Sequence, residues 1–104
     1  MNNSIDTHKK CGVSKTLKII GSKWAMMILH SLFDGTKRFG QLQYDLTGIS
    51  PKTLSQRLDE LEQEGIIKKK IFAEIPPHVE YSLTKKGLSL DEIFKNMAQW
   101  GEKH

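Results

Sequence analysis

A dense group of hydrogen-bonding side chains lies between residues 50 and 57. Its members are Ser50, Lys52, Thr53, Ser55, Gln56 and Arg57. Amide and guanidinium groups can make paired hydrogen bonds to purine edges, so Gln56 and Arg57 are the candidates for reading a base sequence. Hydroxyl and ammonium groups suit phosphate oxygens, which makes Ser50, Thr53 and Lys52 candidates for backbone contacts. The alternative is that the whole group forms a solvent-exposed helix surface that binds nothing.

Other polar residues fit the same chemistry less specifically. Arg38 precedes a short apolar segment, where its side chain could clamp a phosphate or form a surface ion pair. His78 follows two prolines at the tip of an expected hairpin, where minor-groove contact, phosphate contact and plain exposure are all open. Residues 68–70 are all lysine. Because side chains alternate along a strand, at least one of these lysines must point away from the others.

The single cysteine, Cys11, is the one residue with reactive potential. It directly precedes an expected helix and follows His8, Lys9 and Lys10, whose charges would favour the thiolate. A sole cysteine can form a disulfide with a second subunit or a small thiol, but no internal bridge. The alternative is a half-buried small residue without chemistry.

The remaining residue types argue against catalysis. The four histidines stand at positions 8, 30, 78 and 104, and none has metal-ligand spacing to another or to Cys11. The sequence contains no glycine-rich phosphate loop. We therefore expect no enzymatic activity, no metal and no cofactor. Without a leader peptide or a run of about 18 apolar residues, the expected location is the cytoplasm.

The elements that position these residues begin with helices. Apolar spacing predicts helices over residues 13–20, 23–33 and 39–46. Ser50 then serves as an N-cap, Pro51 suits the first helical position, and Gly65 suits the position past the end. Leu54, Leu58 and Leu61 form one apolar stripe on that helix. A short helix, a tight linker and a polar-tipped helix match a helix-turn-helix.

After Gly65 the period changes. Residues 66–75 and 79–83 predict two strands of a hairpin, separated by a Pro-Pro-His turn. Thr84 is expected to cap a last helix over residues 85–103. The fold class is therefore mainly α with a small β-hairpin (α+β), a winged helix-turn-helix. We expect residues 1–104 to form a single domain, with residues 1–10 frayed.

The charge is unevenly distributed along the chain. The net charge of the 104 residues is +4. Residues 1–58 contain nine Lys or Arg against three acids, whereas residues 59–104 contain seven against nine. The positive half includes the expected groove helix, as a nucleic-acid footprint requires, although charge alone is weak evidence.

Ordered sequence pieces carry a family resemblance. They are Cys11, the segment Ile20-Gly21-Ser22-Lys23-Trp24, Arg38-Phe39-Gly40-Gln41-Leu42, residues 49–58, Glu64-Gly65-Ile66-Ile67, residues 76–84 and Trp100-Gly101. In this order they resemble the HxlR-type bacterial winged helix-turn-helix regulators. The resemblance implies a homodimer that binds operator DNA through the helix after Ser50 and the hairpin, often as a repressor. It also implies thiol sensing at Cys11, as described for some relatives. Gly12 departs from the proline that many members have after the cysteine.

The terminal helices are expected to form the dimer interface. The candidate residues are Val13, Leu17, Leu90, Ile93, Phe94, Met97 and Trp100. The alternative is that this apolar seam packs wholly within the monomer. A second function class also stays open, a winged-helix protein-interaction module without DNA binding, which would more often expose apolar residues on the helix after Ser50. The sequence does not identify an inducer or the operator.

Overall fold

The computed structural model describes residues 11–104 of the chain. His8, Lys9 and Lys10, the expected neighbours of Cys11, lie outside the described residues. The elements in chain order are α2 (Gly12–Ile20), α3 (Lys23–Leu32), β1 (Lys37–Arg38), α4 (Phe39–Asp45), α5 (Pro51–Gln63), β2 (Ile67–Phe72), β3 (His78–Leu83), α6 (Lys85–Leu88) and α7 (Asp91–Lys103). The predicted α+β winged helix-turn-helix is confirmed.

The core lies where α3, α4 and α5 meet the body end of the sheet. Its most deeply buried side chains are Ile28, Leu29, Leu42, Leu54, Leu58, Leu61 and Ile67. The leucine stripe predicted for α5 is buried throughout, so the opposite side of this helix must face outward. Burial of this stripe fixes the rotation of α5 about its own axis.

A three-stranded antiparallel sheet forms the wing, with strand order β1-β3-β2. Strands β2 and β3 pair from Ile67 opposite Leu83 to Phe72 opposite His78. The short strand β1 was not predicted, because two residues are too few to show an alternating pattern. It joins the free edge of β3, with Lys37 opposite Tyr81 and Arg38 opposite Glu80.

The predicted last helix, residues 85–103, is wrong in one respect, because it breaks into α6 and α7. Thr84 caps α6 as expected, its hydroxyl accepting a hydrogen bond from the Gly87 amide at 3.1 Å. A Cβ at Gly87 would lie 2.2 Å from the Ile66 carbonyl oxygen, so the glycine allows α6 to lie directly on the start of β2. The Leu90 amide then bonds to the Gly87 carbonyl, three residues back, and α7 starts in a new direction.

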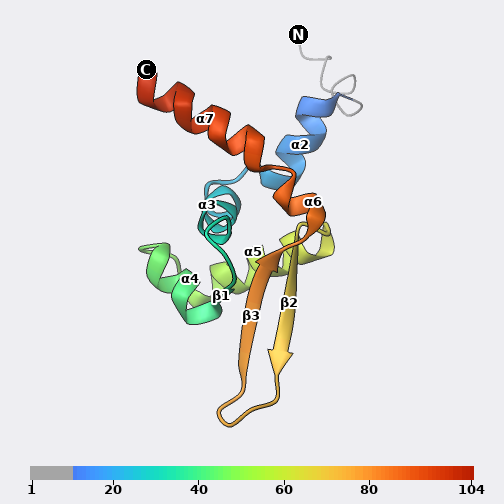
Figure 1. Ribbon diagram of the computed structural model, residues 1–104, viewed down its shortest axis with the longest axis vertical. Helices are drawn as coiled ribbons and strands as arrows, with labels where there is room; N and C mark the ends of the chain where they lie inside the picture. Colours follow the sequence, from blue (N-terminus) through green and yellow to red (C-terminus); the bar gives the residue numbers. More distant parts are fainter. Residues whose placement is uncertain (1–10) are drawn as a thin grey trace.

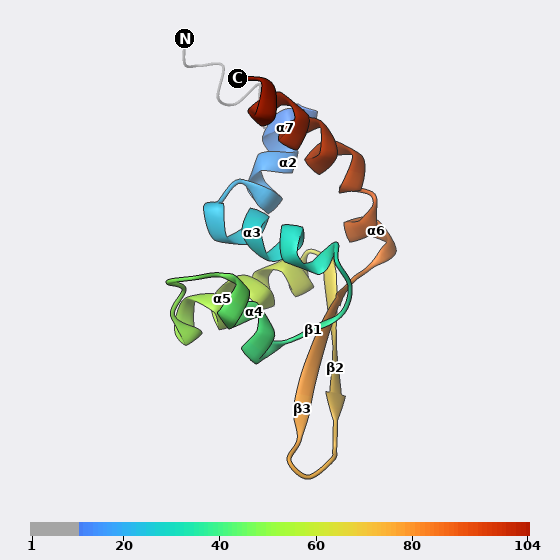
Figure 2. The same ribbon diagram turned by 60° about the vertical axis from the view of Figure 1, so that its left-hand side comes forward.

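The molecule is elongated, with extents of 55 × 32 × 27 Å. The hairpin of β2 and β3 projects from one end, and α2 and α7 occupy the other (Figure 1). Turned by 60°, the hairpin still extends beyond α4 and α5 on the side away from α7 (Figure 2). The helix-turn-helix therefore lies between the wing and the two terminal helices.

Candidate nucleic-acid interface

Helix α5 begins with an ordered cap. The Ser50 hydroxyl accepts a hydrogen bond from the Thr53 amide at 3.1 Å and donates one to the Thr53 hydroxyl at 3.0 Å. Pro51 occupies the first turn, and no acidic residue does. Pro51 has no amide proton and the Leu54 amide bonds to the Ser50 carbonyl, so the Lys52 amide and the helix dipole are what favour an anion at this end.

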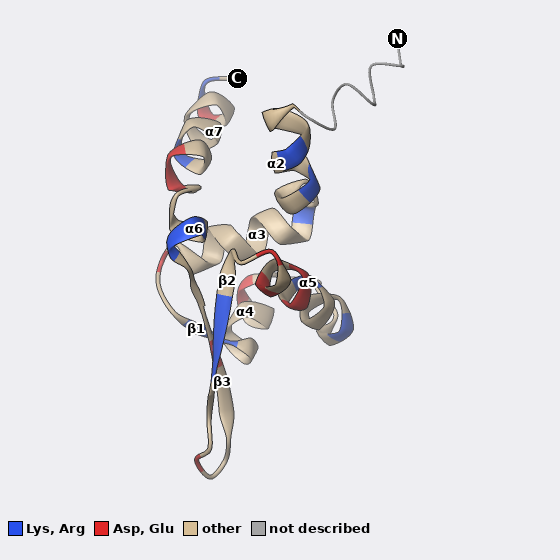
Figure 3. Ribbon diagram, turned by 90° about the vertical axis from the view of Figure 1, so that its right-hand side faces the viewer, with Lys and Arg blue, Asp and Glu red and all other residues tan. Residues whose placement is uncertain are grey.

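The outer face of α5 carries the exposed donors. With the leucine stripe buried, Lys52 and Gln56 project from the opposite side one turn apart, and Ser55 lies beside them. All three side chains are exposed. Figure 3 shows the basic N-terminal end of α5 and the acidic residues that follow it toward β2. This face, Lys52, Ser55 and Gln56, is the part of the predicted group that the fold brings together in solvent.

Arg57 lies at the flank of α5 rather than on its outer face. Its Nη1 donates to Glu60 Oε1 at 2.9 Å, and its Nε is buried without a hydrogen-bond partner. It lines a small depression of about 240 Å³ together with Gly21 and Ser22 of the α2–α3 turn. The guanidinium is thus paired with Glu60 of the same helix and lies at the side of α5 that borders the α2–α3 turn.

The two faces of the wing sheet differ in what they contact. Lys68, Lys70 and Phe72 share one face of β2, and their partners His78, Glu80 and Ser82 share the same face of β3. Arg38 joins this row from β1, opposite Glu80. We call this set, Arg38, Lys68, Lys70, Phe72, His78, Glu80 and Ser82, the outer wing face. Lys68 and Lys70 lie opposite Ser82 and Glu80 on this face, whereas Lys69 lies opposite Tyr81 on the other, so the expected divergence of the three lysines is confirmed.

Lys69 lies on the opposite face, which contacts α5. Its Nζ is 3.9 Å from Glu62 Oε1. Tyr81, its partner on β3, is buried, and burial together with the charges of Asp59 and Glu62 raises the pKa of the phenol. The acids beside the inner face belong to α5, and Lys69 is paired with one of them, whereas the outer wing face offers Lys68 and Lys70 to solvent.

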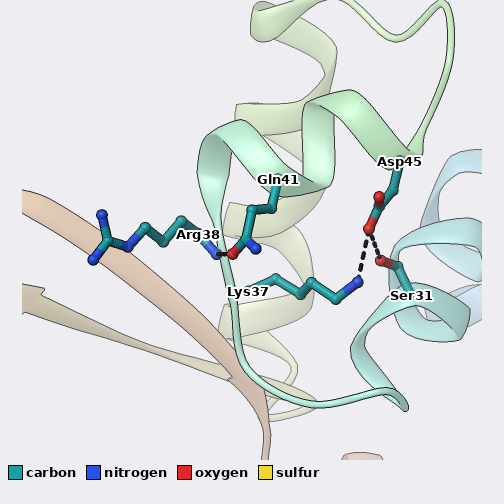
Figure 4. A network of polar contacts seen from close by, with 5 residues as sticks. All are labelled: Ser31, Lys37, Arg38, Gln41 and Asp45. Carbon is teal, nitrogen blue, oxygen red and sulfur yellow. Dashed lines mark hydrogen bonds and ion pairs between the residues drawn. The ribbon is translucent and has the colours of Figure 1, made fainter.

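A polar network fixes the start of the helix-turn-helix. Asp45 Oδ2 accepts hydrogen bonds from Lys37 Nζ at 2.8 Å and from the Ser31 hydroxyl at 2.9 Å, joining α3, β1 and α4 (Figure 4). These two hydrogen bonds, chiefly the one from Lys37, lower the pKa of Asp45. The Arg38 amide donates to Gln41 Oε1 at 2.9 Å, and its side chain extends away from the network (Figure 4). Arg38 is exposed and free of this network, as a phosphate contact requires.

His78 is half-buried at the first residue of β3 rather than exposed at the tip. Its ring stacks on Phe72 with centroids 4.5 Å apart. Its Nε2 lies 3.1 Å from Glu80 Oε2 and its Nδ1 lies 3.6 Å from Glu74 Oε1. Two carboxylates thus surround the imidazole, which places it poorly for a phosphate. The sequence contains both Glu74 and Glu80, but it does not reveal that both carboxylates contact the His78 imidazole.

The terminal helices expose part of the apolar seam. Val13 and Leu17 of α2 are 68% and 59% exposed, and Trp100 of α7 is 66% exposed. Ile93 and Met97 are also exposed. Leu90 and Phe94, by contrast, pack on the chain's own core, and the Phe94 ring lies 5.2 Å from that of Phe33. The seam therefore serves both the monomer core and an uncovered surface.

Cys11 stands at the N-cap of α2 and is partly exposed. It makes no side-chain cap hydrogen bond. Within residues 11–104, no three His, Cys, Asp or Glu side chains cluster as metal ligands. Over the same residues, no helix has both the length and the hydropathy to cross a bilayer.

Comparison with known proteins identifies the family. The model of the HxlR-like helix-turn-helix family matches residues 19–104. The chain is 41% identical to the uncharacterized HTH-type transcriptional regulator YdeP of Bacillus subtilis (strain 168), over 97% of this chain and 79% of that protein.

Solved structures show the same fold. A protein described as a MarR-family transcriptional regulator from Porphyromonas gingivalis W83 superposes with a TM-score of 0.88 at 36% identity, covering 92% of this chain and 94% of that one. The redox regulator HypR in its oxidized form gives a TM-score of 0.84 at 38% identity, covering 90% and 97%. The chain belongs to the HxlR-like helix-turn-helix family of transcriptional regulators.

Proposed function

We propose that the protein binds a two-fold operator as a homodimer and represses transcription. The observation that carries DNA binding is the outer face of α5, where an acid-free, capped helix start presents Lys52, Ser55 and Gln56 to solvent. The recognition helix of a helix-turn-helix contacts base edges in the major groove through its N-terminal residues. Gln56 is assigned to a base edge and Lys52 and Thr53 to phosphates, which Ser50 can join only when its hydroxyl proton leaves the Thr53 oxygen.

The wing and Arg38 would extend this contact along the duplex. Lys68, Lys70 and Arg38 present three cations on the outer wing face, with only Glu80 among them as an acid. Such exposed cations contribute affinity that does not depend on sequence. Arg57 remains a second candidate for a base contact, but its ion pair with Glu60 must open before the guanidinium can reach the groove.

Selection of duplexes from a random pool tests the proposal. The wild-type protein should enrich a palindromic sequence with half-sites about 34–36 Å apart, one helical turn, as two groove helices of a dimer require. A promoter carrying that sequence should then be less active in the presence of the protein. Enrichment of no sequence, with binding no tighter than to random DNA, would refute a sequence-specific regulator.

Homodimerisation would cover the apolar seam. Helices α2 and α7 leave Val13, Leu17, Ile93, Met97 and Trp100 exposed, although each helix also contributes to the core. Exposed apolar side chains on two helices at the same end of the molecule mark a candidate interaction surface. A second copy is the simplest partner, since a two-fold operator requires two groove helices.

A protein-interaction module without DNA binding is the alternative function. The outer face of α5 disfavours it, because Lys52, Ser55 and Gln56 are polar and the apolar residues of this helix are buried.

A regulator of this kind acts on chromosomal DNA, so we place the protein in the cytoplasm, with operator DNA and a second copy as its partners. We propose no catalytic role, metal or cofactor, and the inducer is unidentified.

Thiol control is the proposed form of regulation. Cys11 is partly exposed and starts α2, one of the two helices of the proposed interface. HypR, described as a redox regulator in oxidized and reduced forms, shares the fold at 38% identity. A disulfide or an adduct at Cys11 would change the packing of α2 against the second subunit and thereby the DNA affinity.

A further inference from the structure

The turn of the wing carries apolar side chains in open solvent. Ile75 is 101% exposed, and Pro76 and Pro77 are exposed beside it. These residues stand at the end of the hairpin that projects beyond α4 and α5 (Figure 2). An isolated exposed isoleucine is ordinary on a protein surface, but here three apolar residues form the point of the longest projection.

The wing tip lacks the charges that hold a phosphate. No Lys or Arg occurs between Ile71 and Val79. His78, the one basic side chain in this segment, lies between the carboxylates of Glu74 and Glu80 at 3.6 and 3.1 Å. The tip therefore presents Ile75 beside the exposed carboxylate of Glu74, which lies near His78, and it has no cation like the lysines nearer the body on the same hairpin.

The wing tip is also conformationally restricted. Phe72 and His78, the last paired residues of the hairpin, stack with a 12° angle between their rings. Pro76 and Pro77 have fixed φ angles and restrict the turn beyond them. Restriction before binding lowers the entropy cost of inserting a side chain into a partner.

We propose that Ile75 inserts as an apolar wedge between base pairs in the minor groove and kinks the operator. The inference rests on the proposed DNA binding and adds a contact to it. Isoleucine and proline are among the residues that proteins insert between base steps from the minor groove, with kinks of about 20–90°. Lys68 and Lys70 lie on the same hairpin, so phosphate contacts near the body would carry the apolar tip to the duplex.

Bend measurements on the selected duplex test the wedge. The duplex enriched by the wild-type protein is labelled at both ends, and its end-to-end distance is followed by fluorescence energy transfer. The wild-type protein should shorten that distance. Ile75→Ala should lose the bend and bind about tenfold more weakly, because the buried apolar side chain is truncated.

Matched variants separate insertion from other roles of the hairpin. Ile71→Ala removes a second exposed isoleucine, which lies within β2, and should leave both bend and affinity unchanged. Ile75→Leu should keep the bend. Ile75→Lys should regain affinity through phosphates without restoring the bend.

Two results would overturn the wedge while leaving DNA binding intact. One is a wild-type complex with unbent DNA. The other is an Ile75→Ala protein that bends and binds the duplex like the wild type, which would assign the tip to a protein partner or to solvent. If no duplex is enriched, the proposed function fails and the wedge fails with it.

Discussion

At the scale of single residues, the role of Gln56 can be isolated because α5 provides its own control. Gln63 has the same side chain, lies two helical turns further on nearly the same line of α5, and is exposed as well. Gln56→Ala should cost roughly 1–3 kcal/mol of operator affinity and relax preference at one base position in each half-site. Gln63→Ala should do neither. Competition binding to operator variants measures both, and an equal effect of the two replacements would contradict base reading by Gln56.

Single residues also show where sequence reasoning stops. The type of Arg57 predicts base recognition, but the helix rotation fixed by Leu54 and Leu58 turns this side chain to the flank, where Glu60 binds it. His78 follows the same pattern, since Glu74 and Glu80 approach its ring only after the hairpin forms. Residue type indicates which hydrogen bonds are available, and tertiary packing decides which of them remain free.

At the scale of elements, single substitutions along β2 can separate the contributions of the two faces of the wing to DNA binding. Lys68→Ala and Lys70→Ala should each weaken binding to all sequences similarly and reduce the slope of log affinity against log salt by about 1. Lys69→Ala removes the same charge from the same strand, but Lys69 lies on the inner face of the sheet and contacts Glu62 of α5. That variant should leave the salt slope nearly unchanged. Equal slopes for all three variants would exclude a directional contact by the outer wing face.

The polar network of Asp45, Lys37 and Ser31, which joins α3, β1 and α4, gives a pH-dependent prediction. The pKa of Asp45 is lowered from its ordinary value of 3.8. The carboxylate therefore stabilises the fold at pH values above 3.8, and this stabilisation is lost as the pH falls further, through the folded-state pKa. Asp45→Asn should reduce the free energy of unfolding by about 0.5–1 kcal/mol at pH 7, because the ion pair with Lys37 is partly exposed.

Urea unfolding of wild type and Asp45→Asn, compared from pH 7 to pH 3, measures this effect. The difference between the two should be constant at neutral pH and should shrink below pH 3.8. Asp34→Asn, in the exposed turn after α3, controls for the loss of a charge alone. A difference that persists undiminished at the lowest pH would show that the network does not depend on the ionised carboxylate.

Elements with strong periodicity or clear caps were predictable from the sequence. Helix α5 begins and ends where Ser50 and Gly65 indicate, because the cap and the left-handed glycine (φ +75°) are local features. The break between α6 and α7 was not, because apolar residues continue across it and the close packing of α6 on the Ile66 carbonyl at Gly87 is a tertiary contact. The same holds for β1, whose pairing with β3 is a tertiary contact of two residues.

At the scale of the whole molecule, the dimer interface can be tested with two leucines of similar exposure. Leu17 on α2 is 59% exposed and Leu88 on α6 is 55% exposed. Leu17→Glu should shift sedimentation at micromolar concentration from a dimer toward the 11.9 kDa monomer, since a buried carboxylate would be introduced twice across the two-fold axis. Leu88→Glu should remain a dimer. A wild-type protein that sediments as a monomer would remove the basis for the interface.

Thiol control makes a second prediction for the assembled dimer. Diamide should weaken operator binding by the wild-type protein, and a reductant should restore it. Cys11→Ser should bind the operator normally and ignore diamide. Mass spectrometry of the treated protein provides the check, because full modification of Cys11 with unchanged operator affinity would make the cysteine a structural residue only.

The molecule is elongated, so a small rotation at one end produces a larger displacement at the other. The terminal helices α2 and α7 lie at one end of a 55 Å axis and the wing tip at the other (Figure 1). In the proposed homodimer, a rotation of one subunit by a few degrees about the terminal helices would displace its wing tip by several ångströms, whereas α5, which lies nearer the pivot, would move less. Small changes at α2 should therefore separate the wing from the DNA before they separate α5 from it. A partly induced complex would then keep the base contacts made by α5 and lose the contacts of the wing with the flanking DNA.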